Sequence, residues 1–139
     1  MKRINIVLSA ILLFSSMDVL TQTSWPREIV LDKGIKITVY QPQPESLNGN
    51  KLVTREVVSV RKSKNEEPVF GVVWTEATIS TDKDSRMATM DSINVTAIKF
   101  PDVEDQSKIE SLSTILEAEI PKWKLEIALD QITVSSSRT

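Results

Sequence analysis

Side chains that could carry covalent or metal chemistry are scarce in this sequence, because its 139 residues include no His and no Cys. These absences exclude Ser-His and Cys-His nucleophiles, structural zinc, iron–sulfur ligation and disulfide bonds. Paired carboxylates are the common catalytic apparatus that is left. Asp82 and Asp84 share one polar turn, and Asp102, Glu104 and Asp105 crowd a predicted helix start. Both clusters are typical of solvated positions, whereas a hydrolase needs two carboxylates that face each other across a cleft.

Calcium binding at the polar turn is also disfavoured. Lys83, which is cationic, separates the two aspartates, and neither a Gly nor a twelfth-position Glu follows as in a calcium-binding loop. We therefore expect no catalytic residue, no bound metal and no cofactor, and the sequence favours a non-catalytic protein. An envelope hydrolase that uses acidic residues is the alternative.

Aromatic rings beside polar groups are the remaining candidates, because a ligand such as a sugar stacks on a ring and hydrogen-bonds to its neighbours. Trp25 and Tyr40 lie at the two ends of a predicted hairpin. Gln41, Gln43 and Glu45 follow Tyr40 in a segment that two prolines stiffen, so little conformational entropy would be lost on binding. We expect a ligand site at these five residues. The alternative is that the segment only ends the strand and that both rings pack against the core or the sheet edge.

The other aromatic residues are expected in the interior. Trp74 shares one face of a predicted strand with Phe70 and Val72, which indicates a core position. Phe100 and Trp123 flank the predicted helix, each beside a proline, and are interpreted as packing anchors. A surface site is therefore expected on the first hairpin rather than at these rings.

Charge and composition narrow the class of partner. A net charge of −2 and a pI of about 5.2 lack the electrostatic footprint of a nucleic-acid-binding protein. Hydrophobic residues make up 40% and charged residues 26%, which is typical of a folded globular chain, and the length predicts one domain. We expect an envelope protein or a glycan as the partner and no nucleic acid.

The N-terminus has the three regions of a secretory signal peptide. Lys2 and Arg3 precede an apolar run over residues 6–14, and a polar stretch over residues 15–23 follows. The run is well short of the roughly 20 apolar residues that a membrane span needs. We expect a signal peptide over residues 1–21, an exported protein that is periplasmic or secreted, and no membrane span after signal removal. A buried N-terminal helix is the alternative.

The remaining chain predicts a single domain over residues 22–134 and a polar tail over residues 135–139. Alternation of apolar and polar side chains predicts strands over residues 28–32, 35–40, 51–61, 69–81, 86–100 and 124–134. A bulge is expected around Met90-Asp91, and a turn over residues 46–50. Strands followed by a helix favour an α+β fold with a mostly antiparallel β-sheet of about six strands.

One C-terminal amphipathic helix, at about residues 103–120, is predicted to pack on this sheet. Its apolar residues recur at helical spacing and form one stripe. The stripe consists of Ile109, Leu112, Leu116 and Ile120. Glu110, Ser113 and Glu117 are expected outside it. Asp102 is the expected N-cap, and Pro121 ends the helix.

Five short strings in the mature chain together resemble a known family. They are Trp25-Pro26-Arg27-Glu28, Val39-Tyr40-Gln41-Pro42-Gln43-Pro44-Glu45, Pro68-Val69-Phe70-Gly71, Phe100-Pro101 and Pro121-Lys122-Trp123. The chain resembles the N-terminal region of exported bacterial proteins of unknown function, sometimes labelled carbohydrate-binding family V/XII. The resemblance implies an exported binding or assembly module, or the leading domain of a longer protein. It carries over no catalytic residue.

Overall fold

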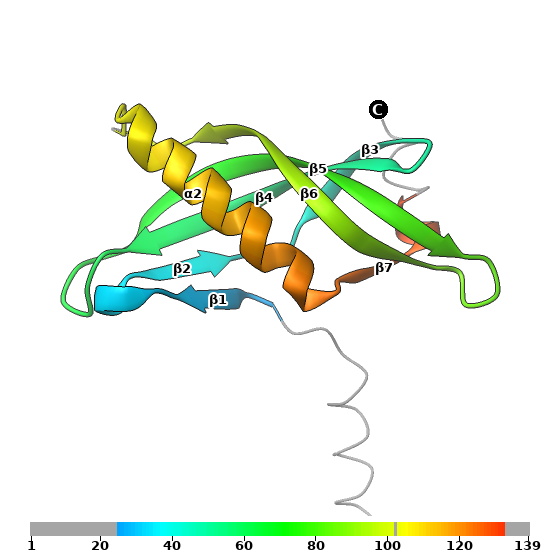
Figure 1. The fold of residues 1–139 in the computed structure, drawn as a ribbon, viewed down its shortest axis with the longest axis horizontal. Coiled ribbons are helices and arrows are strands. Elements are labelled where there is room, and N and C mark those ends of the chain that lie inside the picture. Colours follow the sequence, from blue (N-terminus) through cyan, green and yellow to red (C-terminus); the bar gives the residue numbers. More distant parts are fainter. Residues whose placement is uncertain (1–24, 102, 133–139) are drawn as a thin grey trace, which may run out of the picture.

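A computed structural model of the chain describes residues 25–101 and 103–132 (Figure 1), so the predicted signal peptide and polar tail lie outside the described residues. The described part is an antiparallel sheet with one main helix, which confirms the predicted α+β class. The strands are β1 (Arg27–Val30), β2 (Lys36–Val39), β3 (Gln43–Asn48), β4 (Lys51–Arg61), β5 (Val69–Asp82), β6 (Met87–Lys99) and β7 (Glu126–Ala128). They pair in the order β1-β2-β4-β5-β6-β7, with β3 also paired to β4.

The long strands β4, β5 and β6 form the centre of the twisted sheet, and helix α2 (Gln106–Glu119) crosses one face of it (Figure 1). A register shift leaves Asp91 without a partner on β5, since Thr78 pairs with Ser92 and Ile79 pairs with Met90. This confirms the predicted bulge at Met90-Asp91. Among the described residues, no helix is long and apolar enough to cross a membrane.

Helix α2 packs through the predicted stripe, because Leu112, Leu116 and Ile120 are buried in the core and Ile109 is half-buried. The helix continues as a short 3-10 turn, η2 (Ile120–Trp123). The prediction that Asp102 is the N-cap of the helix is wrong. Residues 103–105 stay non-helical, and the Asp105 carboxylate accepts a hydrogen bond from the Ser107 backbone N–H at 3.0 Å.

Glu117 also departs from the prediction, because it is half-buried and faces the sheet rather than solvent. Strand β7 covers only residues 87–89 of its edge of β6, which leaves the Val95 backbone N–H without a strand partner there. The Glu117 carboxylate accepts a hydrogen bond from this N–H at 2.9 Å. The helix thereby caps part of the sheet edge through a polar side chain.

Two further segments differ from the sequence-based expectation. The segment expected as a turn over residues 46–50 belongs mostly to β3, and the turn itself is confined to its last residues, with Gly49 at a φ of 58°. The expected last strand stops at Ala128, and residues 129–132 are helical. Leu129 and Ile132 are three residues apart, the spacing at which a helical turn keeps both on one side, and Ile132 is buried.

The core lies on the face of the sheet that α2 covers, called the inner face here. On β5 its members are Val73, Thr75, Ala77 and Ile79. The prediction that Phe70, Val72 and Trp74 are in the core is wrong, because they alternate with these residues and lie on the opposite, outer face. The inner face of β5 was hard to predict because it includes Gly71, which has no apolar side chain. The Phe100 ring occupies the space beside Gly71, where a Cβ would lie 2.5 Å from it.

Candidate functional site

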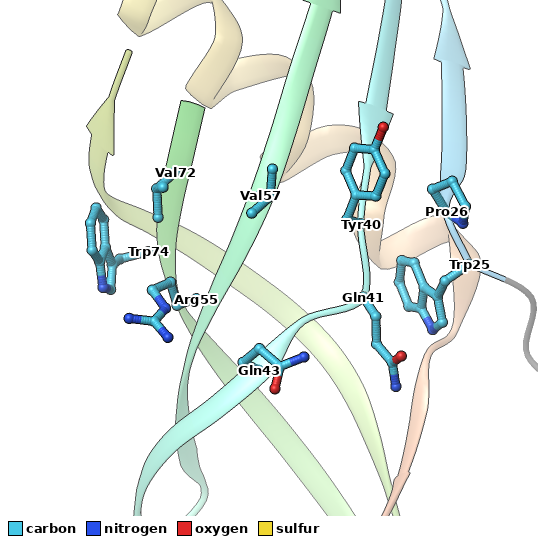
Figure 2. A pocket seen from close by; sticks show the side chains of 9 residues that line it. All are labelled: Trp25, Pro26, Tyr40, Gln41, Gln43, Arg55, Val57, Val72 and Trp74. Carbon is cyan, nitrogen blue, oxygen red and sulfur yellow. The ribbon is translucent and has the colours of Figure 1, made fainter. Parts of the chain in front are cut away.

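A groove of about 720 Å³ opens on the outer face of the sheet (Figure 2). Its lining residues are Trp25, Pro26, Tyr40, Gln41, Gln43, Arg55, Val57, Val72 and Trp74. The structure therefore brings four of the five sequence-predicted residues into one groove. The fifth, Glu45, does not line the groove but lies 3.7 Å from a guanidinium nitrogen of Arg55, which does.

The irregular link between β2 and β3 positions the predicted residues. Pro42 cannot donate a ladder hydrogen bond, so β2 ends at Val39 and the chain crosses to a new strand. The Tyr40 backbone N–H donates to the Val57 carbonyl at 3.0 Å, which fastens the start of the link to β4. Gln41 and Gln43 are exposed on either side of the half-buried Pro42, so their amides are free to face a ligand.

The floor and far wall of the groove come from β4 and β5, which sequence reasoning missed. Val57 pairs in register with Val72, and Arg55 pairs with Trp74, so alternate residues of both strands face outward together. Figure 2 shows Trp74 and Trp25 at opposite ends of the groove, with Val57 between them. The sequence contained a signal for these residues. Alternation along β4 places Arg55 and Val57 on one face, and assigning Val72 and Trp74 to the outer face of β5 would have placed them beside these two residues.

The ring of Trp25 forms the other wall of the groove, and Trp123 and Arg27 pack against it. It packs edge-on against Trp123 with ring centroids 6.3 Å apart. The guanidinium carbon of Arg27 lies 5.4 Å from the centroid of each of these two rings. Trp25 is half-buried and packs against the core, as the alternative to a surface site predicted, and it also lines the groove.

The residues that line the groove carry one positive charge and no negative charge, although the chain has a net charge of −2. Arg55 is the charged residue among those lining the groove, and Lys99 lies with its Nζ 5.7 Å from the Trp74 ring centroid. The Arg55–Glu45 separation of 3.7 Å exceeds hydrogen-bonding distance, so this ion pair leaves guanidinium donors available. A positive charge in the groove favours a ligand that carries a negative charge.

A second, much smaller cavity of about 10 Å³ lies behind the Trp25 wall. Trp25 and Pro42 cover it on the groove side, and Trp123 also lines it. The side chain of Glu56 reaches this cavity from the inner face of β4 and is only 4% exposed. The volume is comparable to one water molecule, so the cavity is too small for an organic ligand.

The Glu56 carboxyl is only half satisfied by hydrogen bonds. Thr54 Oγ1 donates to Oε1 at 2.6 Å. Thr75 Oγ1 lies 3.4 Å from the same oxygen and 2.6 Å from Thr54 Oγ1, so its single hydrogen is shared between these two acceptors. Oε2 is buried and has no hydrogen-bond partner among the described residues. The pKa of Glu56 is raised to about 7. Burial is the main cause, and the hydrogen bonds from the two threonines oppose it by a smaller amount.

Sequence reasoning also missed Glu56. The available signal was its position two residues after Thr54 and two before Val58 in a β-branched strand, which places a carboxylate on the buried face. In the ranges 25–101 and 103–132, no group of three or more His, Cys, Asp or Glu residues could hold a metal ion.

Comparison with protein-family models, with curated proteins and with solved structures finds no match to this chain. The family resemblance therefore stays a prediction from the sequence. The function is argued below from the groove itself.

Proposed function

We propose that this protein is an exported, non-catalytic module that binds a glycan in the outer groove. The observation that carries the proposal is the set of side chains in the groove of about 720 Å³, where two indoles and a phenol surround an apolar floor. The volume lies within the range of known small-molecule sites. Export is proposed on the basis of the tripartite N-terminus, which lies outside the described residues.

A glycan is the ligand class that this mixture of groups fits. Sugar rings have apolar C–H faces that stack on aromatic rings, and the groove offers Trp25, Tyr40 and Trp74. Sugars also have hydroxyl groups at their edges, which the amides of Gln41 and Gln43 can bind as donors and acceptors. An envelope protein as the partner is the other outcome that the binding experiment distinguishes.

Binding without catalysis is favoured over the alternative of an acidic hydrolase. Glycoside hydrolysis uses two carboxylates on opposite sides of the scissile bond. The residues that line the groove include no carboxylate, and Glu45 lies beside Arg55 rather than in the groove. Glu56 has the raised pKa that a general acid needs, but it faces the small cavity behind Trp25.

The proposal is tested by measuring retention on a panel of immobilised neutral and acidic polysaccharides. We expect retention on at least one glycan by the wild type and its loss in a Tyr40→Ala, Gln43→Ala double variant. Gln106→Ala is the matched control, because Gln106 is an exposed glutamine at the start of α2 on the other face. Binding by the wild type to an envelope protein but to no glycan contradicts the proposed ligand class.

A further inference from the structure

Glu56 lies directly behind the outer groove, and the two spaces share a wall. Trp25 lines both the groove and the small cavity that contains the Glu56 side chain. Pro42 covers the cavity, while Gln41 and Gln43 on either side of it line the groove. One short stretch of chain therefore both shapes the groove and closes the cavity over a buried carboxyl.

Resting on the function proposed above, we propose that the protonation state of Glu56 controls the groove. While Glu56 is protonated, Trp25 and Pro42 close over it and the groove has its full shape. When Glu56 ionises, this shared wall loosens to admit water to the carboxylate, and the groove loses the position of its Trp25 ring. Ligand binding is then strongest below neutral pH and weakens above it.

The hydrogen-bond pattern at Glu56 is the physical reason. A buried carboxylate is stable only where several donors or a cation compensate its charge. The two threonine hydroxyls both reach Oε1, and Oε2 has no partner among the described residues. A neutral acid tolerates this site, whereas an ionised one requires water at Oε2.

The charged groups around the site do not replace that water. Glu45 on β3 acts on Glu56 electrostatically, and its negative charge disfavours a second carboxylate. Arg27 on β1 stacks on Trp25 and Trp123, outside the ring of residues that line the cavity. The other residues lining the cavity are uncharged; they are Trp25, Val39, Pro42, Thr75, Met90, Ile93, Ile120, Trp123 and Leu125.

The shared wall is the side of the cavity that opens most easily. Strands β4, β5 and β6 bound the site on other sides and are paired through long antiparallel ladders, of which the one between β5 and β6 shifts register at two points. Pro42 lies in the link between β2 and β3, and Trp25 precedes β1, so neither is in a ladder. Local opening occurs first where the fewest backbone hydrogen bonds must break.

The change is expected near neutral pH, since the pKa of Glu56 is about 7 in the folded protein. The chain contains no His and no Cys, the side chains that otherwise titrate in this range. A pH-dependent signal from the groove wall near neutrality is therefore traceable to very few groups. One substitution at Glu56 identifies its source.

The test requires no ligand, so its result is independent of the glycan proposal. The protein is labelled with fluorotryptophan, and its three Trp signals are assigned by single Trp→Phe variants in fluorine NMR. We expect the Trp25 signal to shift with a midpoint near pH 7, while the Trp74 signal at the other end of the groove stays constant. In Glu56→Gln the Trp25 shift is lost, and in the matched control Glu45→Gln it remains.

A second variant covers the case in which Glu56→Gln does not fold. Thr54→Val removes the shorter hydrogen bond to Oε1, which favours the charged form, so the midpoint of the Trp25 shift moves to higher pH. A Trp25 signal that is constant with pH overturns the inference, as does a midpoint unchanged in Glu56→Gln or Thr54→Val. A titrating Trp25 in a protein that retains no glycan supports the coupling and contradicts only the proposed function.

Discussion

The indole of Trp25 packs edge-on against that of Trp123, with the ring centroids 6.3 Å apart. This contact joins the segment before β1 to the end of the helical region, two parts of the chain almost a hundred positions apart. Arg27 reinforces it by placing its guanidinium 5.4 Å from both ring centroids. The wall of the groove is therefore positioned by side-chain packing in an aromatic cluster rather than by strand pairing.

Arg27→Ala is expected to destabilise the protein by about 1 kcal/mol, because two cation–π contacts and the packing of the arginine stem are lost. Chemical denaturation followed by circular dichroism measures the change. Arg55→Ala is the matched control, since Arg55 is exposed on the outer face and stacks on no ring that the structure describes. We expect less than about 0.5 kcal/mol for it. Equal losses in the two variants contradict the anchoring role of Arg27.

Leu112→Ala is expected to destabilise the fold by about 2–5 kcal/mol, because it leaves a cavity between α2 and the sheet. Leu112 is 8% exposed and belongs to the core cluster. Glu110 lies on the solvent side of the same helix, so Glu110→Ala is expected to change stability by less than about 0.5 kcal/mol. Urea denaturation of both variants is the measurement, and equal effects contradict the packing of α2 through this face.

Glu56 is expected to make the protein less stable as the pH rises. Its pKa is raised from 4.5 in the unfolded chain to about 7 in the folded protein. The folded state therefore binds the proton more tightly, so the contribution to stability is complete below pH 4.5 and is lost as the pH rises through about 7. The loss is about 3 kcal/mol.

The contribution of Glu56 is isolated by comparison with Glu56→Gln. Denaturation of both proteins at several pH values gives the difference in unfolding free energy, in which the effects of other groups cancel. The stability of the wild type relative to Glu56→Gln should fall between about pH 4.5 and about pH 7. A difference that is constant with pH, or that rises, contradicts the burial of this carboxyl.

Arg55 is expected to favour acidic glycans over neutral ones. Polygalacturonate and its methyl ester share one backbone and differ in charge, so the ratio of their affinities isolates the electrostatic part of binding. In Arg55→Gln this ratio should fall by about threefold to tenfold, and added salt should lower it in the wild type. Affinity electrophoresis in gels containing each polymer measures it. A ratio unchanged in Arg55→Gln contradicts the contribution of the guanidinium.

The fold class was predictable because it depends on local patterns. Alternation along β4, β5 and β6 and the helical spacing of Leu112 and Leu116 are present in the sequence itself. The bulge at Asp91 was predictable for the same reason. Strand β3 was not, because prolines and polar residues give its segment the composition of a turn, and only pairing to β4 makes it extended.

The groove was predictable only on the side built by consecutive residues. Tyr40, Gln41 and Gln43 are neighbours in sequence, so their association needed no knowledge of the sheet. Arg55 and Trp74 meet through the register of β4 and β5, which the sequence does not specify. Both faces of β5 carry apolar residues near Trp74, and the packing of α2 decides which of them becomes the core.

The most direct test of the binding site is to map a retained glycan onto the protein by two-dimensional amide NMR. The side-chain signals of Gln41, Gln43, Trp25 and Trp74 report on the groove. We predict that a polysaccharide retained in the panel shifts these four signals and leaves the backbone amides of α2 unchanged. Shifts confined to α2, or to any surface outside the groove, contradict the central claim that the outer face of the sheet is where this protein binds its ligand.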